Sequence, residues 1–249
     1  MSERSRPYHH GDLRAALVAE ALEVARCGPT ALSLREVTRR VGVSPAAAYR
    51  HFRDRSALMG ALASEIQDRM VARMRARDES LTEQDPQNAA LLRLRGVGLG
   101  YIDFALEEPG WFELAFFGPA DEDGLPSSVR VPPASGARLG PAAVSGSRPG
   151  AAAANASRPG SSPGRGTDPA GSPALRQVPP FAELMAALDE CAATGALSPE
   201  RRRGAEFSCW SAVHGCAELM VHGPLRGAPG PVVREVAERV VDDIVAGVR

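Results

Sequence analysis

The sequence predicts an all-α protein, and three observations support this fold class. Apolar residues recur at spacings of three and four along most of the chain, which is the pattern of a helix with one buried face. Capping residues precede these segments, and glycines follow them. No segment shows the alternation of apolar and polar residues that is typical of a half-buried strand. The 249 residues are enough for one or two domains with a buried core.

The N-terminal part begins with two predicted helices. The first covers residues 12–25, has its apolar residues on one face, and ends before Gly28. The second covers residues 34–41. Ser33 and Glu36 have the spacing of a capping box, in which the hydroxyl and the carboxylate each accept a hydrogen bond from a free amide of the first turn. Both helices are therefore short and have clear ends.

A tight turn joins the second helix to a third. Gly42 supplies the left-handed residue of this turn, Ser44 caps the next helix, and Pro45 takes its first position, where no N–H is needed. Two short helices joined in this way form a helix-turn-helix, whose second helix can lie in the DNA major groove. Asp54 then caps a longer helix that extends to residue 75. DNA is therefore the first partner that the sequence suggests.

A second helical region follows and is interrupted once. Its first part has helical spacing over 91–105, and a short aromatic helix opens at Pro109. After the interruption, a helix covers 181–195, a long helix covers 198–221, and a last amphipathic helix covers 231–248. The long helix is apolar on two sides, which predicts burial on two sides. We expect the last two helices to form a four-helix interface in a dimer.

The interruption, residues 119–180, differs from the rest in composition. It holds twelve of the twenty-one prolines and no aromatic residue, and Ser-Arg-Pro-Gly occurs in it twice, at 147–150 and 157–160. Such a segment buries too little apolar surface to offset the conformational entropy of ordering it. We therefore predict a disordered insertion.

Charge is distributed unevenly along the chain. Residues 1–60 hold ten arginines and six acidic residues, a net charge of +4, whereas the remainder has a net charge of −5. A positive N-terminal part suits a polyanion such as DNA. No apolar run reaches the ~18 residues that a membrane span needs, and the N-terminus lacks the hydrophobic region of a signal peptide. We expect a cytoplasmic protein with no membrane partner.

The four cysteines show no metal-binding or redox spacing, and in a reducing compartment we interpret them as buried thiols. The alternative is an enzyme with Cys209 or Cys216 as nucleophile and His214 or His222 as base. Cys209 and His214 would lie roughly 140° apart around one helix, which counts against it. The sequence also lacks a Gly-rich phosphate loop and the HExxH and GxSxG elements. It therefore indicates no enzyme, no cofactor and no metal site.

Several of these pieces occur in the order and spacing of a known family. Residues 8–66 resemble the DNA-binding domain of TetR/AcrR-type transcriptional regulators, and the resemblance rests on Leu32-Ser33-Leu34-Arg35-Glu36-Val37, Gly42-Val43-Ser44, Tyr49-Arg50-His51-Phe52, and Arg55 with Leu58. The C-terminal part resembles the WHG-type effector domain of the same family through Trp210, His214 and Gly215, and Pro109-Gly110-Trp111-Phe112 also fits. The resemblance covers the chain except for the insertion.

The resemblance implies a homodimer in which each subunit offers one recognition helix to half of a palindromic operator in double-stranded DNA. It also implies an effector domain with a small-molecule pocket, and most members repress transcription. We therefore expect a ligand-responsive repressor. The alternatives are an activator, or an architectural DNA-binding protein without an effector, which ligand-dependent release from DNA would exclude.

The expected organisation has four parts. The helix-turn-helix domain covers 1–55 and includes a basic arm at 1–10, which either follows the DNA or is a solvated tail. The linking helix and the first part of the effector domain cover 56–118. The insertion covers 119–180, and the remainder of the effector and dimerisation domain covers 181–249.

The recognition helix maps onto residues 45–51. By resemblance, Tyr49, His51 and Arg55 contact phosphates, and Arg50 reaches a phosphate or a guanine edge. The alternative for Tyr49 and His51 is that they only pack the helical unit. The predicted DNA-binding residues are Ser33, Arg35, Ser44, Pro45, Ala46, Ala47, Tyr49, Arg50, His51 and Arg55.

Three alanines at 46–48 stand where many relatives carry a larger or polar residue. Alanine offers only apolar contact, for example to a thymine methyl group, so base discrimination is expected to depend on Arg50, on the start of the second helix and on DNA shape. Phe52 is expected in the core. The hydroxyl of Thr38 is expected to bond back to its own helix.

The effector pocket is expected among aromatic residues and one histidine of the C-terminal helices. Core packing is the alternative for this aromatic stripe. His214 lies one turn from Trp210 and either donates to a ligand or caps a backbone carbonyl in the core. The candidate pocket residues are Tyr101, Phe104, Trp111, Phe112, Trp210 and His214.

Overall fold

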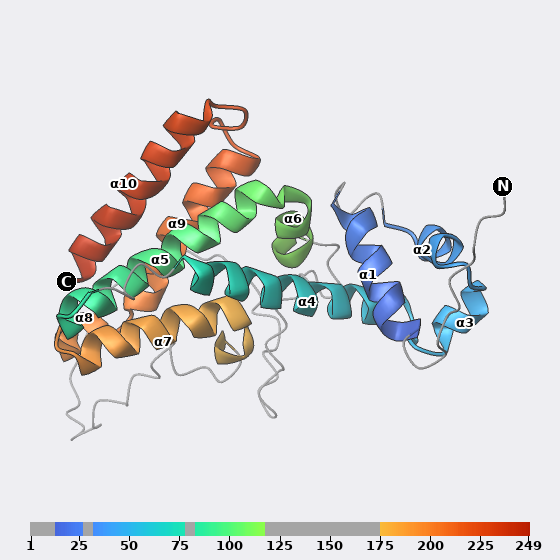
Figure 1. Ribbon diagram of the computed structural model, residues 1–249, viewed down its shortest axis with the longest axis horizontal. Coiled ribbons are helices and arrows are strands. Elements are labelled where there is room, and N and C mark those ends of the chain that lie inside the picture. Colours follow the sequence, from blue (N-terminus) through green and yellow to red (C-terminus); the bar gives the residue numbers. More distant parts are fainter. Residues whose placement is uncertain (1–12, 27–31, 78–82, 118–174) are drawn as a thin grey trace, which may run out of the picture.

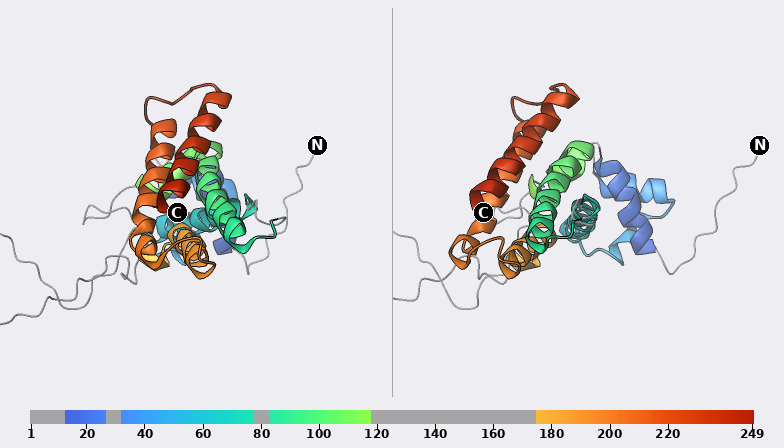
Figure 2. Two further views of the ribbon diagram at one scale, coloured as in Figure 1. Left: turned by 90° about the vertical axis from the view of Figure 1, so that its left-hand side faces the viewer. Right: turned by 60° about the vertical axis from the view of Figure 1, so that its left-hand side comes forward.

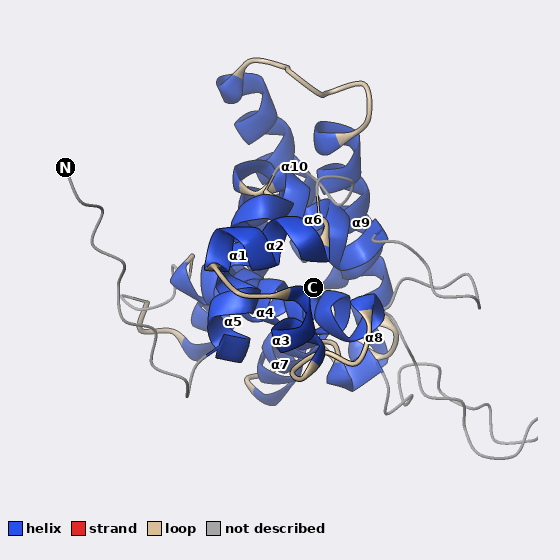
Figure 3. Ribbon diagram, turned by 90° about the vertical axis from the view of Figure 1, so that its right-hand side faces the viewer, coloured by secondary structure: helices blue, strands red, loops and turns tan. Residues whose placement is uncertain are grey.

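The computed structural model of the chain describes residues 13–26, 32–77, 83–117 and 175–249. These residues form helices joined by turns and loops, without a strand, so the all-α prediction is confirmed (Figures 1 and 3). None of the described helices is long and apolar enough to cross a membrane. The predicted insertion lies outside the described part up to residue 174, as does the predicted N-terminal arm at 1–10. Its predicted end at 180 is wrong, because residues 175–177 form a 3-10 turn and a helix begins at Pro179, where proline fits the first turn.

Three short helices form a head at one end of the molecule (Figure 1): α1 (Leu13–Ala25), α2 (Leu34–Val41) and α3 (Pro45–Tyr49). Ser33 caps α2 by accepting a hydrogen bond from the Glu36 amide at 3.2 Å, and Gly42 ends α2 in the left-handed conformation, with φ 78°. Ser44 caps α3 by accepting from the Ala47 amide at 3.3 Å. The predicted helix-turn-helix is therefore present.

Apolar side chains from all three helices meet inside the head. Leu17 and Ala21 of α1, Val37 of α2 and Ala48 of α3 are fully buried, and Phe52, just beyond α3, is 2% exposed. The core position predicted for Phe52 is confirmed. Because one alanine and the following phenylalanine anchor α3, the other side chains of this helix are left to face outward.

The long helix α4 (Arg55–Ala76) connects the head to the rest of the molecule (Figures 1 and 2). Asp54 caps it by accepting from the Ala57 amide at 2.8 Å, as predicted. One face of α4 is buried along its whole length, first against the head and then against the C-terminal helices. The buried residues of this face include Leu58, Leu62, Ile66, Met70 and Met74.

The C-terminal part corresponds to the predicted effector domain, and we keep that name for it. It is built around α5, which packs against α4, α6, α7, α9 and α10 (Figure 2). Its elements are α5 (Pro86–Glu107), α6 (Pro109–Phe117), the 3-10 turn η5 (Leu175–Gln177), α7 (Pro179–Ala193), α8 (Pro199–Arg202), α9 (Ala205–Val221) and α10 (Gly230–Val248). Gly100 lets α5 approach α4 closely, because a Cβ there would lie 2.5 Å from the Cα of Met74.

Two local predictions are wrong. The helix expected over 198–221 is divided into α8 and α9, because Gly204 between them adopts the left-handed conformation with φ 76°. The recognition helix is also shorter than expected: α3 ends at Tyr49, with Arg50 as its C-cap, so His51 lies in the turn that follows. The side chains of Arg50 and His51 are therefore presented by a helix end rather than by a helix face.

Candidate functional site

The outward side of α3 and its flanks forms one exposed surface, which we call the recognition surface. Tyr49 is 55% exposed and is the most exposed large hydrophobic side chain in the described part of the chain. Ala47 is half-buried, and the other members are exposed. All ten predicted DNA-binding residues lie on α3, at the start of α2 or α4, or in the turns between these helices, and none of them is buried: Ser33, Arg35, Ser44, Pro45, Ala46, Ala47, Tyr49, Arg50, His51 and Arg55.

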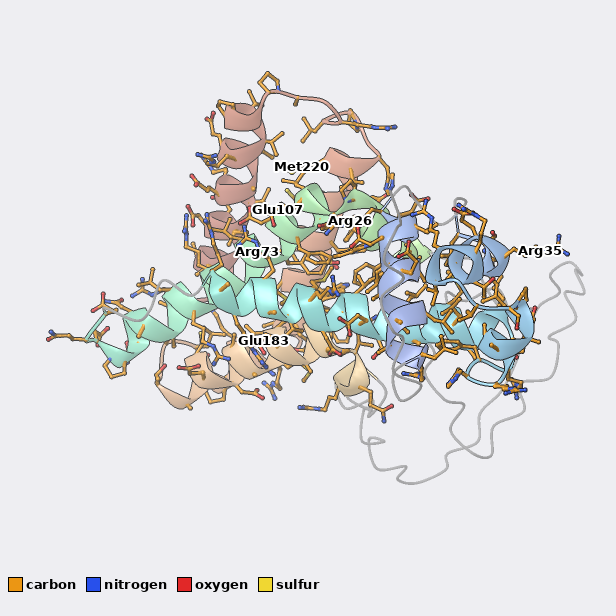
Figure 4. The ribbon with its side chains drawn as sticks, turned by 45° about the vertical axis from the view of Figure 1, so that its right-hand side comes forward. Arg26, Arg35, Arg73, Glu107, Glu183 and Met220 are labelled. Carbon is orange, nitrogen blue, oxygen red and sulfur yellow. The ribbon has the colours of Figure 1, made fainter. Side chains whose placement is uncertain are left out.

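Three arginines of the recognition surface carry free positive charge. Arg35, Arg50 and Arg55 are exposed, and none of them forms an ion pair with another described residue. Figure 4 shows Arg35 projecting outward at the end of the head. A guanidinium without a carboxylate partner can bind phosphate oxygens without first breaking an ion pair. This surface therefore has the charge and the exposure that a polyanion requires.

The two other arginines of α2 are engaged within the head. The Glu36 carboxylate accepts from Arg39 at 2.6 Å and from Arg40 at 2.7 Å, and these hydrogen bonds lower the pKa of Glu36 to about 2. Arg40 also pairs with Glu20 of α1 at 3.2 Å. The capping box is therefore only half formed, because the Glu36 carboxylate binds arginines instead of the free amide of the cap.

The three alanines at 46–48 do not act alike. Ala48 is fully buried, so only Ala46 and Ala47 can offer an apolar contact to bases, which corrects the expectation that three alanines face the groove. The Thr38 hydroxyl donates to the Arg35 carbonyl at 3.0 Å, as predicted. Apolar readout by this head is therefore limited to the first turn of α3.

An aromatic cluster occupies the effector domain and contains four of the predicted pocket residues. Its members are Tyr101 of α5, Phe112 and Phe116 of α6, and Trp210 and His214 of α9; the ring centroids of Tyr101 and Trp210 are 5.1 Å apart, and those of Phe116 and His214 are 5.3 Å apart. The sequence reasoning missed Phe116, although its signal was the apolar face of the aromatic segment that opens at Pro109.

A neutral hydrogen bond joins α5 to α9 inside this cluster. The Tyr101 hydroxyl lies 2.8 Å from His214 Nδ1. Burial lowers the pKa of His214, so the imidazole is neutral at pH 7 and this hydrogen bond joins two uncharged groups. Burial, and then the charge of Glu218, raises the pKa of Tyr101. The cluster therefore brings no positive charge of its own to the core.

The two remaining predicted pocket residues lie at the junction of the head and the effector domain. Trp111 donates from Nε1 to the Leu22 carbonyl of α1 at 2.8 Å. The guanidinium groups of Arg26 and Arg69 lie 4.7 and 4.9 Å from the centre of a Trp111 ring, and Phe104 packs on it with centroids 6.4 Å apart. Sequence spacing grouped Phe104 and Trp111 with the cluster, but their partners come from α1 and α4.

The first turn of α6 fits tightly against the end of α1. A Cβ at Gly110 would lie 2.3 Å from the Arg26 carbonyl oxygen, so the backbones meet where only glycine fits. Arg26 also pairs with Glu108 at 3.0 Å, and Figure 4 shows it at this junction. Since α6 contributes Phe112 and Phe116 to the aromatic cluster, one short helix contacts both the cluster and the head.

A small apolar cavity lies where α5, α9 and α10 come together. Its volume is about 20 Å³, enough for about one water molecule. Of the six predicted pocket residues, only Tyr101 and Trp210 line it. Gly98, Val213 and Val241 also line it and escaped prediction, because their proximity depends on contacts between distant segments.

The three cysteines in the described part of the chain are buried thiols, as predicted. Cys191, Cys209 and Cys216 are buried, and burial raises the pKa of Cys191 and of Cys209 to about 11. His214 is bonded to Tyr101, and His222 lies 3.0 Å from Glu218. Among the described residues, no group of three or more His, Cys, Asp and Glu side chains could hold a metal ion.

Two family models match separate parts of the chain. Residues 17–62 match the model of bacterial regulatory proteins of the tetR family, which spans the helix-turn-helix and the start of α4. Residues 161–244 match the model of the tetracyclin repressor-like C-terminal domain. This second match begins inside the segment predicted to be an insertion and extends into α10.

Two solved structures resemble the whole chain. A protein of unknown function from Rhodococcus sp. RHA1 is 25% identical, with a TM-score of 0.62 over 98% of both chains. SCO4313, described as a regulatory protein, is 21% identical, with a TM-score of 0.55 over 94% of this chain and 96% of its own, and this likeness concerns the fold alone. A search of curated proteins found no match.

Proposed function

Because this chain belongs to the TetR family of bacterial regulatory proteins and is a DNA-binding transcriptional regulator, we propose that it is a homodimeric repressor that leaves a palindromic operator when a small molecule binds its effector domain. The exposed recognition surface, whose three arginines form no ion pair with another described residue, is the single observation that carries the proposal. We place the protein in the cytoplasm, where it has access to DNA.

The chemistry of the recognition surface supports specific roles in DNA contact. We assign Tyr49, His51 and Arg55 to phosphates, since their polar ends are exposed around the end of α3. We assign Arg50 to a phosphate or a guanine edge. We assign Ala46, which is exposed in the first turn of α3, to a thymine methyl group. These contacts would fix the head on the DNA while leaving part of the base discrimination to DNA shape.

Exposed apolar side chains support α9 and α10 as the dimer interface. Phe207 is 36% exposed, Leu219 48% and Val232 43%, and all three lie on these two helices, which pack against each other. Outside the recognition surface, no other large hydrophobic side chain of the described residues is exposed. A second copy of the same helix pair would cover these side chains and complete a four-helix interface.

The junction at α6 supports a response to a small molecule. The aromatic cluster holds α6 through Phe112 and Phe116, while the first turn of α6 holds α1 through Trp111. A ligand that shifts the cluster would therefore move the head of each subunit, and the spacing of two heads decides whether both half-sites can be bound at once.

The experiment is a measurement of operator binding by matched variants. Footprinting on the intergenic DNA beside divergently placed genes gives the operator, and fluorescence anisotropy gives the affinity. Arg50→Gln should weaken binding ~tenfold and reduce the salt slope by about 1. Arg203→Gln removes the same charge from an exposed arginine that follows α8 and should change neither quantity.

Equal effects of the two substitutions would contradict the assignment of the recognition surface. Repression is tested with a reporter gene downstream of the operator: loss of the regulator should raise transcription. A fall in transcription would make the protein an activator. A compound that relieves repression should also release the DNA in vitro, and an architectural protein would show no compound-dependent release.

A further inference from the structure

The cavity between α5, α9 and α10 has walls of one chemical kind. Apolar side chains from these three helices form most of the walls, among them Val97, Val213 and Ile244, together with the rings of Tyr101 and Trp210. Met74 of α4 and Leu184 of α7 complete them. No ionisable carboxylate, guanidinium or imidazole group lines it. The Tyr101 hydroxyl is already bonded to His214. Cys209, which also lines the cavity, is a neutral thiol because burial raises its pKa to about 11.

Such walls select against both water and charge. A buried water needs two to four polar partners, and these walls do not provide them. A charged ligand would lose its hydration without gaining an ion pair or a hydrogen bond. An apolar molecule loses little favourable hydration on leaving water. It gains dispersion contacts with cavity-lining atoms that otherwise have no neighbour on that side.

One side of the cavity is bounded by a close contact between α5 and α10. A Cβ built on Gly98 of α5 would lie 3.2 Å from Cγ2 of Val241 on α10 and 3.4 Å from Cγ1 of Val213 on α9. At this position the three helices pack closely, and a methyl group on α5 would have to displace Val241 by a few tenths of an ångström. A ligand larger than about one water must therefore move a wall of the cavity, which at this contact means moving α10 away from α5.

We propose that this cavity is the effector site and that it takes an uncharged, apolar ligand, whose size is limited by Gly98 and Val241. The inference rests on the proposed response to a small molecule and names the class of that molecule. Because α10 is both a wall of the cavity and half of the proposed dimer interface, occupancy of the cavity would act on the spacing of the two heads.

The main competing ligand is an organic cation. Glu218 lies one turn beyond His214 on α9, and its Oε2 atom is buried without a hydrogen-bond partner, although Oε1 pairs with His222. A carboxylate beside an aromatic cluster is a suitable site for a cation. Glu218 does not line the cavity, however, and nothing but apolar groups meets a ligand there.

Three probes of the same ring distinguish these classes: toluene, benzylammonium and benzoate. Binding is measured on the full-length protein as a saturable rise of the melting temperature, and independently through the emission of Trp210, which lines the cavity. Trp210→Phe should abolish the emission change and keep the thermal shift, which assigns the signal to this tryptophan rather than to Trp111 at the junction.

Two substitutions should move the affinity for toluene in opposite directions. Val241→Ala removes the methyl groups that bound this side of the cavity and should tighten toluene binding about tenfold. Gly98→Ala places a methyl group inside it and should weaken binding about tenfold, while the better helix propensity of alanine favours folding. Val240→Ala, on the same helix but outside the cavity, is the matched control and should leave toluene binding unchanged.

The proposal predicts binding of toluene and not of the two ions, with the order Val241→Ala, wild type, Gly98→Ala from tight to weak. It is overturned if toluene binds neither the wild type nor the Val241→Ala variant, or if the affinities do not follow this order. It is also overturned if benzylammonium binds more tightly than toluene and the Glu218→Gln substitution removes that binding. Operator release is measured separately by anisotropy. Toluene binding without release would retain the ligand class and contradict the proposed response.

Discussion

The arginines of the recognition surface and those of the effector domain are used in opposite ways. Arg35, Arg50 and Arg55 are exposed, without an ion pair to other described residues. In the effector domain, Arg75 and Arg93 both bind the buried carboxylate of Glu183, at 2.7 and 3.1 Å. Charge that is neutralised inside the protein holds helices together, whereas charge left free remains available to a polyanion.

The effector domain repeats this pairing between other helices. Arg73 of α4 binds Glu107 at 2.8 Å and Asp103 at 3.1 Å, both on α5, and Figure 4 shows Arg73 and Glu107 side by side. Arg202 binds Glu206, a fully buried residue of α9, at 2.7 Å. The arginine side chains of one protein therefore serve two purposes, and substitutions can separate them.

The largest effect is expected at Glu183, whose side chain is 4% exposed. Glu183→Gln would leave Arg93, 28% exposed, with only Glu190 as an acidic partner. We expect the free energy of unfolding to fall by about 2 kcal/mol, less than for a fully buried pair because Arg75 reaches solvent. Urea unfolding measures it.

Asp189→Asn in the same helix is the matched control for this prediction. The Asp189 side chain is 57% exposed and pairs with Arg202, so its loss should cost no more than about 0.5 kcal/mol. If the two substitutions cost the same, the buried pairs contribute no more than surface pairs, and the distinction between the two regions fails for stability.

Glu183 also predicts a dependence of stability on pH. Burial by itself raises the pKa of Glu183, but hydrogen bonds from Arg75 and Arg93 outweigh it, and the net pKa lies below the ordinary value of 4.5. This carboxylate therefore contributes stability above pH 4.5 that is lost as the pH falls through its lowered pKa. Unfolding in urea between pH 7 and pH 3 should show a smaller loss for Glu183→Gln than for the wild type. Parallel curves would exclude this contribution.

Local signals predicted the helices well, because caps and spacing act within a few residues. Ser33, Ser44 and Asp54 cap as expected, and the position of Phe52 followed from its place after a short exposed helix. The break at Gly204 was missed, since a glycine inside an apolar pattern is compatible with a continuous helix until its φ is known.

The effector site was harder to predict, because helical spacing indicates that a side chain is buried but not which other helix it packs against. Trp111 and Tyr101 have the same signature in the sequence, yet Trp111 contacts α1 and Tyr101 contacts α9. The cavity depends on Gly98 meeting Val241, more than a hundred residues away in the chain. Neither residue type is distinctive by itself, so no local pattern could identify them.

A smaller effect is expected at Tyr49, where the recognition surface can be tested without disturbing the core. Tyr49→Phe removes one hydroxyl from a side chain that is 55% exposed. Operator affinity should fall about fivefold, the value of one hydrogen bond, with the free energy of unfolding unchanged. Anisotropy and urea unfolding measure the two quantities. Unchanged affinity at matched salt would remove Tyr49 from the contacts.

The smallest effect is expected at Glu36. This residue belongs to the head, but it pairs with two arginines in the way that the carboxylates of the effector domain do. Its ion pairs are on the surface, where such pairs contribute little, so Glu36→Gln should leave the stability nearly unchanged. The substitution would release Arg39, leave Arg40 with Glu20 as its remaining partner, and remove a negative charge close to the operator. We expect about threefold tighter DNA binding and a steeper salt dependence. Glu65→Gln on α4, which releases Arg69 far from the recognition surface, should not change DNA binding. Equal effects of the two substitutions would mean that pairing, rather than position, decides which arginines are available to DNA.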